Sequence, residues 1–379
     1  MNVVKMQVVT KQIRGVSYKP TDLHDSLNSS SVILLRANNI DDGKINFDDV
    51  VYVDKSKVSK DQYLKKGDIL ICASSGSKQL VGKAASFDFD KECTFGAFCK
   101  VVRPDENVAD YIGKYFQSVK YRSIISNVAI GANINNIRNE HIDSLELPMY
   151  STEKANDIVH LLSKVQSIIE YRKQELSNLD DLIKARFVEV FGDMICNPNG
   201  WEKVLLGEAC DVRDGTHDSP KYFSEGYPLV TSKNVTGGKL NFTDCSLICE
   251  EDYNKINQRS KVDVGDILMP MIGTVGNPVI VDIDAAFAIK NVALIKFREN
   301  STVINSFVKA LLESDYFDRS VISKVRGGTQ KFISLGDIRK LEICLPPIDV
   351  QEQFAGFVKQ VDKSKVIFMK IEDKLNMLY

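Results

Sequence analysis

The stretch Gly43-Lys-Ile-Asn-Phe47 occurs a second time, as Gly238-Lys-Leu-Asn-Phe242, about 196 residues further along the chain. Gly67-Asp-Ile-Leu70 returns in the same way, as Gly265-Asp-Ile-Leu268. A repeating unit of this length is too long for a solenoid or a propeller blade, so we expect each copy to be a domain followed by a helix. A duplicated domain on a duplicated helix suggests a protein that touches two similar targets at a fixed separation.

Two further correspondences carry the repeat to the end of each copy. Leu145-Glu-Leu-Pro148 returns, with two extra residues, within Leu341-Glu-Ile-Cys-Leu-Pro346, and a helical run that begins near Ile158 returns near Phe354. We therefore predict a first domain over 1–150, a spacer helix over 151–196, a second domain over 197–346 and a second spacer helix over 347–379. The predicted fold class is α+β, with two similar mixed domains related by a pseudo-twofold repeat.

The composition is that of an ordinary globular protein, with 44% hydrophobic and 26% charged residues in 379. No apolar run approaches the ~18–20 residues of a membrane span and no signal peptide is evident, so a cytoplasmic location is expected. The eight cysteines form no CxxC pair, which predicts free thiols and no metal site. The net charge of −2 does not favour nucleic-acid binding, although a local basic face would suffice for it.

Within each domain the pattern is one of short strands and one helix. Helices are expected over 110–128 and, in the second copy, over 306–321, because apolar residues recur there on one face. Strand-like segments rich in β-branched residues are Val32–Leu35, Val50–Val53, Ile69–Cys72 and Phe98–Val102.

The two spacer helices carry apolar residues at alternating spacings of three and four, which is the coiled-coil pattern. In the first helix the predicted seam is Ile158, Leu161, Val165, Ile168, Arg172, Glu175, Leu179 and Leu182. In the second it is Phe354, Phe357, Val361, Phe368, Ile371, Leu375 and Leu378, with Ser364 between.

Either each helix packs on its own domain, or the two pack on each other in antiparallel fashion as a rod. The second interpretation is preferred, with Arg172 and Glu175 as a polar layer that fixes the register. From Ile158 to Phe191 the helix would be about 50 Å long, on the scale of one to two turns of duplex DNA.

Known catalytic motifs are missing. Asn197-Pro-Asn-Gly200 and Pro346-Pro347 both depart from the Asn/Asp-Pro-Pro-aromatic loop of methyltransferases that act on base amino groups. The segment Gly76–Lys83 has five residues between its glycines where a phosphate-binding P-loop has four, and Ala84 follows where Ser or Thr would hold magnesium. His217 stands in a glycine-rich polar loop, but a surface histidine is the simpler interpretation. A catalytic role is therefore not expected.

The order of the motifs resembles the specificity (S) subunit of type I restriction–modification systems over the whole chain. In the first half the resemblance rests on Leu182-Ile-Lys-Ala-Arg-Phe187 with Val190-Phe-Gly-Asp193. In the second it rests on a series of elements in fixed order: Trp201-Glu-Lys-Val-Leu-Leu-Gly-Glu208, Gly265-Asp-Ile-Leu268, Gly273-Thr-Val-Gly276, Tyr316-Phe317, Gly327-Gly-Thr-Gln330, Ile333, Leu345-Pro-Pro347 and Gln351-Glu-Gln353. The N-terminus departs from the family by lacking the Trp-x-x-x-x-Leu-Gly element, and the first half closes with Leu147-Pro-Met149.

The resemblance implies a non-catalytic subunit in which each domain reads one half of a split site on double-stranded DNA. The helices would set the unread gap and dock two modification methyltransferase subunits, and motor–nuclease restriction subunits would join them. S-adenosylmethionine, ATP and Mg²⁺ would be bound by those partners and not by this chain. The alternatives are a scaffold whose paired domains bind protein, which would show weak salt dependence, and a stand-alone enzyme, which the missing methyltransferase loop disfavours.

Lys and Arg on phosphates would supply DNA affinity, and planar polar side chains on base edges would supply specificity. Loops on a rigid scaffold are the favoured positions, although any one of the residues is as readily an ordinary solvated side chain. In the first domain the candidates are Arg36, Asn38, Lys78, Gln79, Lys83, Asn133 and Asn135. In the second they are Lys221, Lys233, Asn234, Thr274, Lys290, Asn291, Arg326, Gln330 and Lys331.

Overall fold

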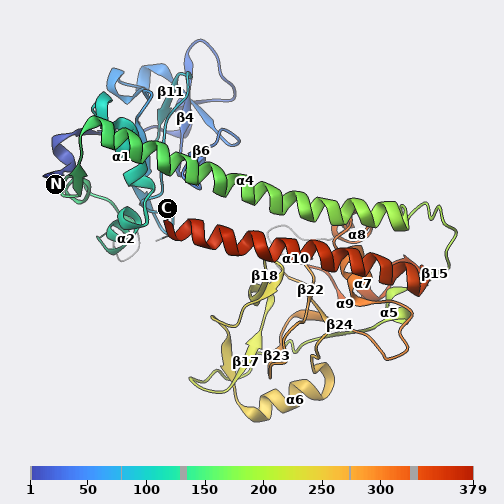
Figure 1. The fold of residues 1–379 in the computed structure, drawn as a ribbon. Coiled ribbons are helices and arrows are strands. Elements are labelled where there is room, and N and C mark those ends of the chain that lie inside the picture. Colours follow the sequence, from blue (N-terminus) through green and yellow to red (C-terminus); the bar gives the residue numbers. More distant parts are fainter. Residues whose placement is uncertain (1, 78, 129–134, 273–274, 325–331, 379) are drawn as a thin grey trace. The chain divides into compact units, whose positions relative to one another are not determined.

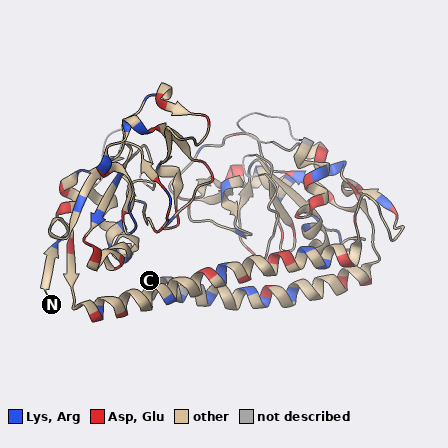
Figure 2. Cartoon of the chain, turned by 90° about the horizontal axis from the view of Figure 1, so that it is seen from above, with Lys and Arg blue, Asp and Glu red and all other residues tan. Residues whose placement is uncertain are grey.

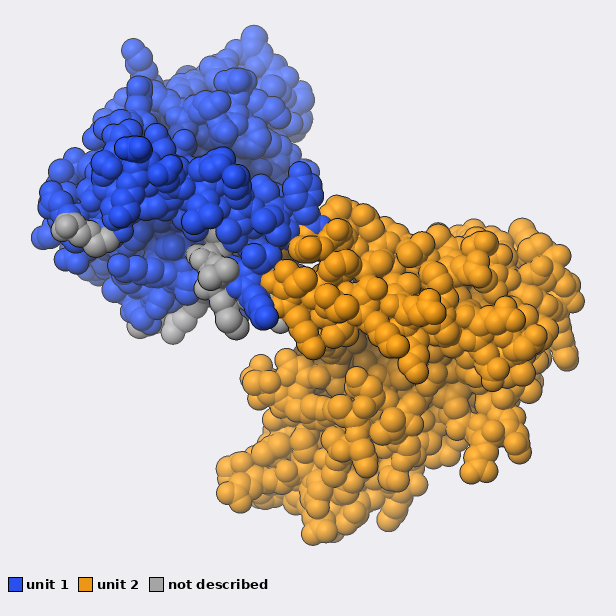
Figure 3. Space-filling model, viewed as in Figure 1, with its two compact units in different colours: residues 1–171, 372–379 blue, residues 172–371 orange. Residues whose placement is uncertain are grey.

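The computed structural model describes residues 2–77, 79–128, 135–272, 275–324 and 332–378. The chain forms two compact units, one of residues 1–171 with 372–379 and the other of residues 172–371 (Figure 3). Each unit contains one globular domain and part of the two long helices. No helix in the described part of the chain is long and apolar enough to cross a membrane.

The first domain is built on two four-stranded sheets. One is antiparallel throughout, in the order β10(Ala84–Ser86)-β8(Ile69–Cys72)-β12(Cys99–Pro104)-β2(Thr10–Arg14). The other has the order β11(Cys93–Phe95)-β4(Ser31–Leu35)-β7(Val51–Asp54)-β3(Leu23–His24), with β11 parallel to β4. Short pairs join β1(Asn2–Lys5) to β14(Glu146–Met149), β5(Ile40–Asp41) to β6(Lys44–Ile45), and β9(Ser74–Ser75) to β13(Asn135–Asn136). One core cluster fills the space between the sheets, and a second packs below the helices.

The second domain repeats this topology. The order β16(Asp211–Asp214)-β24(Val292–Lys296)-β21(Ile267–Pro270)-β22(Val279–Ile280) matches β2-β12-β8-β10. The order β20(Ser246–Ile248)-β17(Tyr227–Val230)-β23(Ala288–Ile289) matches β7-β4-β11, and again one strand pair is parallel. β15(Lys203–Leu205) pairs with β25(Glu342–Cys344) as β1 does with β14. The predicted α+β repeat is therefore confirmed, and the first copy has the terminal strand β1 although its N-terminus lacks the Trp-x-x-x-x-Leu-Gly element.

The helices predicted over 110–128 and 306–321 are each broken into two. The first is α1(Ala109–Gln117) and α2(Val119–Val128), and the second is α7(Asn305–Leu312) and α8(Asp315–Ser320). The breaks fall near Ser118 and Ser314, which have extended backbone angles. The Ser118 hydroxyl donates to the Tyr115 carbonyl at 2.6 Å and accepts from the Tyr121 amide at 3.2 Å. A serine that bonds its neighbouring backbone in this way competes with the continuous helix, which apolar spacing alone does not reveal.

The repeated Gly-Lys-x-Asn-Phe stretch forms the same hairpin in both domains. Its turns have positive φ at Asp42 and Gly43 (44° and 75°) and at Gly237 and Gly238 (60° and 72°). Two consecutive residues with positive φ make the tight turn that matches strand twist, which favours Gly, Asn and Asp. In the second domain the hairpin joins β18(Val235–Thr236) to β19(Lys239–Leu240). The repetition of this stretch is explained by backbone geometry.

The repeated Gly-Asp-Ile-Leu stretch places one buried carboxylate before a buried strand. Asp68 is 1% exposed, accepts a hydrogen bond from the Lys65 amide at 2.8 Å and pairs through both oxygens with Arg103 at 2.7 Å. Asp266 likewise accepts from the Asp263 amide at 2.8 Å and pairs with Lys296 at 2.6 Å. The motif therefore ties the start of β8 or β21 to the end of the neighbouring strand.

The two long helices are α4(Thr152–Phe191) and α10(Ile348–Leu378), and the parts of them that belong to the second unit, residues 172–191 and 348–371, run in opposite directions side by side (Figure 1). Within the second unit Phe187 packs edge-on against Phe354 with centroids 5.7 Å apart, and the Lys365 ammonium lies 2.5 Å from an Asp180 carboxylate oxygen. These contacts confirm antiparallel packing. The second domain is joined to this pair because Phe187 and Phe354 belong to its core cluster.

The predicted seam of the first helix is right at alternate positions and one residue out of phase at the others. Ile158, Val165, Arg172 and Leu179 are half-buried, whereas Leu161, Ile168, Glu175 and Leu182 are exposed. The inward residues at those turns are instead Leu162, Ile169, Leu176 and Ile183. Adjacent apolar pairs such as Leu161-Leu162 satisfy a spacing of three or of four equally well, so periodicity could not choose between them.

The seam of the second helix agrees better with the prediction. Phe354 and Val361 are buried, and Phe357, Phe368, Ile371 and Leu375 are partly buried. The side chain of Leu378 lies outside the described residues. In the polar layer, Arg172 reaches the facing helix, with its guanidinium 4.9 Å from the ring centre of Phe368, while Glu175 pairs with Arg172 from the exposed side at 2.5 Å.

Candidate nucleic-acid interface

In the second domain several loops meet at one edge of the sheets. Because β17 and β23 are parallel, both end at this edge, where the Lys290 amide donates to the Val230 carbonyl at 2.9 Å. Thr216, just after β16, forms a bridge with Lys290. The end of β21 follows at Met271, whose carbonyl accepts from the Ile333 amide at 3.0 Å. We call the surface around Thr216, Thr231, Met271 and Lys290 the loop edge of the second domain.

The first domain has an equivalent loop edge around Val16, Arg36, Ala73 and Gly96. Val16 bridges Gly96, the Gly96 amide donates to the Leu35 carbonyl at 2.9 Å, and the Ile137 amide donates to the Ala73 carbonyl at 2.8 Å. These bonds correspond one for one with those of the second domain.

Glycine is required next to each bridge. A Cβ on Gly15 would lie 2.1 Å from the Gly96 carbonyl oxygen, and one on Gly215 would lie 2.1 Å from the Ile289 carbonyl oxygen. No side chain fits at such distances, so the close approach of the two loops depends on these glycines. The scaffold of the loop edge is thus encoded twice in the sequence.

The side chains on the second loop edge form a polar cluster around His217. The imidazole contacts Asn291 Oδ1 at 2.8 Å through Nδ1 and Asp214 Oδ2 at 2.9 Å through Nε2, and Arg259 pairs with the other oxygen of Asp214. The hydrogen bond with Asn291, followed by that with Asp214, raises the pKa of His217 above its ordinary value. A pocket lined by Asp214, Thr216, Lys255 and Arg259 adjoins the cluster. His217 is therefore held by neighbours on both ring nitrogens, as a positioned loop residue.

On the first loop edge the corresponding side chains differ. Arg36 Nη2 lies 2.9 Å from Asp49 Oδ2, and Asn38 Nδ2 donates to the same oxygen at 2.7 Å. Lys100, which has no counterpart because Ala293 occupies its position, is buried and donates to Asn139 Oδ1 at 2.6 Å. Burial lowers the pKa of Lys100 from 10.5 to about 8. Sequence patterns did not reveal this residue, since a lysine in an alternating strand is expected to face solvent.

The predicted DNA contacts fall into several groups. Arg36, Asn38, Lys233, Lys290 and Asn291 lie on the loop edges; Lys290 Nζ is 2.6 Å from Ser219 Oγ. Lys221 and Gln79 are exposed, and Lys83 lies 3.7 Å from Asp41 on the hairpin. Lys78, Asn133, Thr274, Arg326, Gln330 and Lys331 lie outside the described residues, as does the side chain of Asn135. None of these placements tests DNA contact, which stays a prediction.

Asn234 needs a correction, because its side chain faces inward. It is 3% exposed, its Oδ1 accepts from the Thr231 amide and hydroxyl at 3.0 and 2.8 Å, and its Nδ2 donates to the Asn241 carbonyl at 3.2 Å. Asn39 has the same place in the first domain, with its Oδ1 accepting from the Arg36 amide. Asn234 therefore holds the loop together and does not offer its amide to a ligand.

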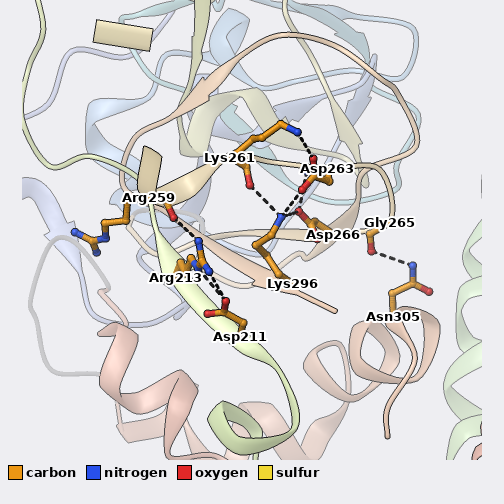
Figure 4. A network of polar contacts seen from close by, with 9 residues as sticks. All are labelled: Asp211, Arg213, Arg259, Lys261, Asp263, Gly265, Asp266, Lys296 and Asn305. Atoms are coloured by element: carbon orange, nitrogen blue, oxygen red, sulfur yellow. Dashed lines mark hydrogen bonds and ion pairs between the residues drawn. The ribbon is translucent and has the colours of Figure 1, made fainter. Parts of the chain in front are cut away.

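The opposite end of the central strands carries a dense ionic network (Figure 4). Lys296, at the end of β24, contacts Asp263 at 2.8 Å and Asp266 at 2.6 Å, and Arg213 pairs with Asp211. Burial raises the pKa of Asp266. The cations here are matched by acids, which indicates a structural role for this end of the sheet.

Charge and metal-ligand patterns do not mark a catalytic centre in the described part of the chain. Figure 2 shows Lys and Arg interspersed with Asp and Glu along both long helices. Among the described residues, no group of three His, Cys, Asp or Glu side chains is placed to hold a metal ion. All eight cysteines are free, and burial raises the pKa of Cys93, Cys99 and Cys210 to about 12. Such thiols are poor nucleophiles at neutral pH.

Two copies of one α+β domain, each followed by a long helix, with the two helices antiparallel, define a duplicated recognition protein. The profile of the type I restriction modification DNA specificity domain matches residues 26–180 and again residues 198–377. The chain belongs to this family.

Named relatives agree with this assignment. The chain is 28% identical over 385 residues to the type I restriction enzyme EcoKI specificity subunit of Escherichia coli K12, covering 95% of this chain and 81% of the relative. It is 36% identical over 180 residues to the StySPI specificity subunit of Salmonella potsdam, covering 47% of this chain and 39% of that one.

Solved structures show the same fold. One is a chain from a study of complex assembly and conformational transition of the type I R-M system, with a TM-score of 0.53 and 19% identity, covering all of this chain and 95% of the other. The type I S subunit from M. genitalium gives a TM-score of 0.50 at 13% identity, covering all of this chain and 93% of the other.

Proposed function

We propose that this specificity subunit reads a split, asymmetric sequence on double-stranded DNA, with one half-site for each domain. The observation that carries the proposal is the pair of loop edges: the same backbone bonds are present in both domains, while the side chains that they position differ. A duplicated scaffold with two sets of polar side chains suits two half-sites of different sequence.

The long helices would set the unread gap and would dock the modification subunits. A 40-residue helix such as α4 is about 60 Å long. Leu161, Ile168, Tyr171 and Leu182 are exposed apolar residues on its outer side, which a single chain leaves uncovered. Such residues at helical spacing fit a methyltransferase partner, one copy for each half of the pseudo-twofold repeat.

The chemistry is proposed to reside in the partners. Methyltransferase subunits would supply S-adenosylmethionine-dependent adenine methylation, and motor–nuclease subunits would supply ATP- and Mg²⁺-dependent translocation and cleavage. This chain would act in the cytoplasm as the non-catalytic component that chooses the sequence.

The test is single-molecule sequencing of genomic DNA for methylated adenines with and without this gene. A split motif that disappears on deletion would support the proposal and would give both half-sites with the gap. A reconstituted complex that binds every duplex equally, without sequence preference, would refute it. A protein-binding scaffold would instead bind its partner with weak salt dependence, since phosphate contacts make affinity fall steeply with salt.

A further inference from the structure

Each loop edge carries an exposed phenylalanine, Phe98 in the first domain and Phe332 in the second. Their exposed fractions are 71% and 48%. We propose that these two rings are specificity-determining contacts, each inserting as an apolar wedge at one base step of its half-site. The inference rests on the proposed function and adds a defined mode of base contact to it.

Phe98 stands on a rigid turn between β11 and β12. Its carbonyl accepts hydrogen bonds from the Ala73 amide at 2.9 Å and the Ser74 amide at 3.1 Å, and the Cys99 amide donates to the Gly96 carbonyl at 2.8 Å. The backbone under the ring is therefore fixed by three bonds, while most of the ring faces solvent. A fixed backbone lowers the ordering cost of binding.

Phe332 stands at a different place, directly before a segment that is anchored by backbone hydrogen bonds. It forms a bridge with Ile272, and the next residue, Ile333, is fully buried with its amide bonded to Met271. Ser334 then caps α9(Leu335–Arg339) through its hydroxyl, which accepts from the Asp337 amide. The two residues that follow the ring are therefore anchored, while about half of the Phe332 side chain faces solvent.

The two phenylalanines are not equivalent in the repeat. The bridge of Phe332 with Ile272 in the second domain corresponds to the pairing of Asn136 with Ser74 in the first. The first domain therefore has the side chain of an asparagine at the position where the second domain has Phe332. The turn of Phe98 is one residue longer than its counterpart, where Asn291 bonds His217. The apolar contact should therefore fall at a different step in each half-site.

The surroundings favour a nucleic-acid base over a protein surface. Arg36 and Asn38 lie on the loop edge that carries Phe98, and Lys233 and Lys290 lie on the loop edge that carries Phe332, so each edge also offers groups suited to phosphates and base edges. A phenylalanine inserted from such a surface unstacks a base step and bends the duplex. A protein interface would need a broader apolar area around the ring.

The experiment uses the full chain reconstituted with its methyltransferase partner and duplexes carrying 2-aminopurine at each position of each half-site in turn. Apart from the target adenine, which the methyltransferase subunits flip out of the duplex, the wild-type complex should raise fluorescence at one further step in each half-site. Phe98→Ala should abolish the signal in the first half-site only, and Phe332→Ala in the second only. Each change should weaken binding roughly 5- to 100-fold, by the typical worth of one base–aromatic contact. Phe→Leu variants should retain part of the signal.

Matched controls lie at the opposite ends of the same sheets. Val8 lies before β2 and is 66% exposed, and Val264 lies before β21 and is 59% exposed. The control variants Val8→Ala and Val264→Ala therefore each remove an exposed apolar side chain far from the loop edge. Both should bind like wild type. The inference is overturned if Phe98→Ala and Phe332→Ala bind within twofold of wild type with unchanged fluorescence, or if they lose methyltransferase assembly instead of DNA affinity. A wild-type complex with no sequence-selective binding would refute the proposed function itself.

Discussion

Asp68→Asn should destabilise the first domain strongly, because it removes the charge partner of Arg103. The Arg103 side chain is only 17% exposed and meets Asp68 through two bonds of 2.7 Å. Breaking a buried pair by neutralising one partner costs about 3–5 kcal/mol. Arg103 keeps a hydrogen bond to the Tyr63 carbonyl at 2.8 Å, so the lower end, about 3 kcal/mol, is expected.

The equivalent change in the second domain, Asp266→Asn, should cost less. Lys296 would keep Asp263 at 2.8 Å and the Lys261 carbonyl at 3.0 Å, so its charge would not be stranded. Burial already raises the pKa of Asp266, which lowers the cost of a neutral side chain there. We expect about 1 kcal/mol, the scale of one ordinary hydrogen bond.

Hydrogen exchange with mass-spectrometric readout measures the two domains separately, since a chain of two domains does not unfold in one step. Peptides from β8 and β12 should lose protection in Asp68→Asn, and those from β21 and β24 should lose less in Asp266→Asn. Asp61→Asn, which breaks the exposed pair with Lys11, is the surface control and should leave protection unchanged. Equal losses in the two domains, or a loss below about 1 kcal/mol for Asp68→Asn, would refute the reasoning.

Three further predictions address the loop edges and the helix junction. Lys100→Gln should remove a pH dependence of the free energy of unfolding. The pKa of Lys100 is about 8 in the folded protein and 10.5 as its ordinary value, so the free energy of unfolding of wild type should rise by up to about 3 kcal/mol between these pH values. Hydrogen exchange measured over this pH range should show the rise in wild type and not in the variant. Lys233→Ala should weaken binding to specific and non-specific DNA alike and should reduce the slope of log affinity against log salt concentration by about 1. Asn234→Ala should instead lower the hydrogen-exchange protection of β18 and β19 in the free protein. Identical behaviour of the two variants in both assays would contradict the assignment. Gln351→Leu should increase hydrogen exchange at the start of α10, because the buried Gln351 side chain accepts from the Ile304 amide and donates to the Thr302 and Pro346 carbonyls at 2.8–3.0 Å. Unchanged exchange at the N-terminus of α10 would count against this role.

The duplication could be predicted from the sequence because the repeated stretches encode backbone features. Tight turns with positive φ and a buried acid before a strand permit few residue types, so they survive in both copies as readable motifs. The helix breaks at Ser118 and Ser314 were missed because serine capping competes with an apolar periodicity that continues through it. The phase of the α4 seam was missed for a related reason, since adjacent apolar residues such as Leu161 and Leu162 fit both spacings.

The candidate site was only partly accessible from the sequence. Choosing polar residues in repeated loops selected Arg36 and Asn291, which lie on the loop edges, but the same rule selected Asn234, whose amide is hydrogen-bonded within its own loop. It also passed over Phe98, because a phenylalanine beside a strand is normally expected in the core. Exposure and hydrogen-bond partners decide such cases, and neither can be obtained from residue type.

The two domains share the residues that fix the backbone of the loop edges and differ in the side chains that these edges present. This difference by itself supports the proposed recognition of two DNA half-sites. Gly15 and Gly215 place the loops, and Asp68 and Asp266 fix the strands beneath them, so the backbone under each loop edge is the same. A protein that bound one ligand twice would also need the same side chains on that backbone. Here the turn that carries Phe98 corresponds to one that carries Asn291, and the chemistry presented by the two edges differs. Discrimination between two unlike half-sites requires two rigid edges with different side chains. Specificity depends on the favourable contacts that each edge makes with its own half-site and on the unfavourable contacts that it makes with other sequences.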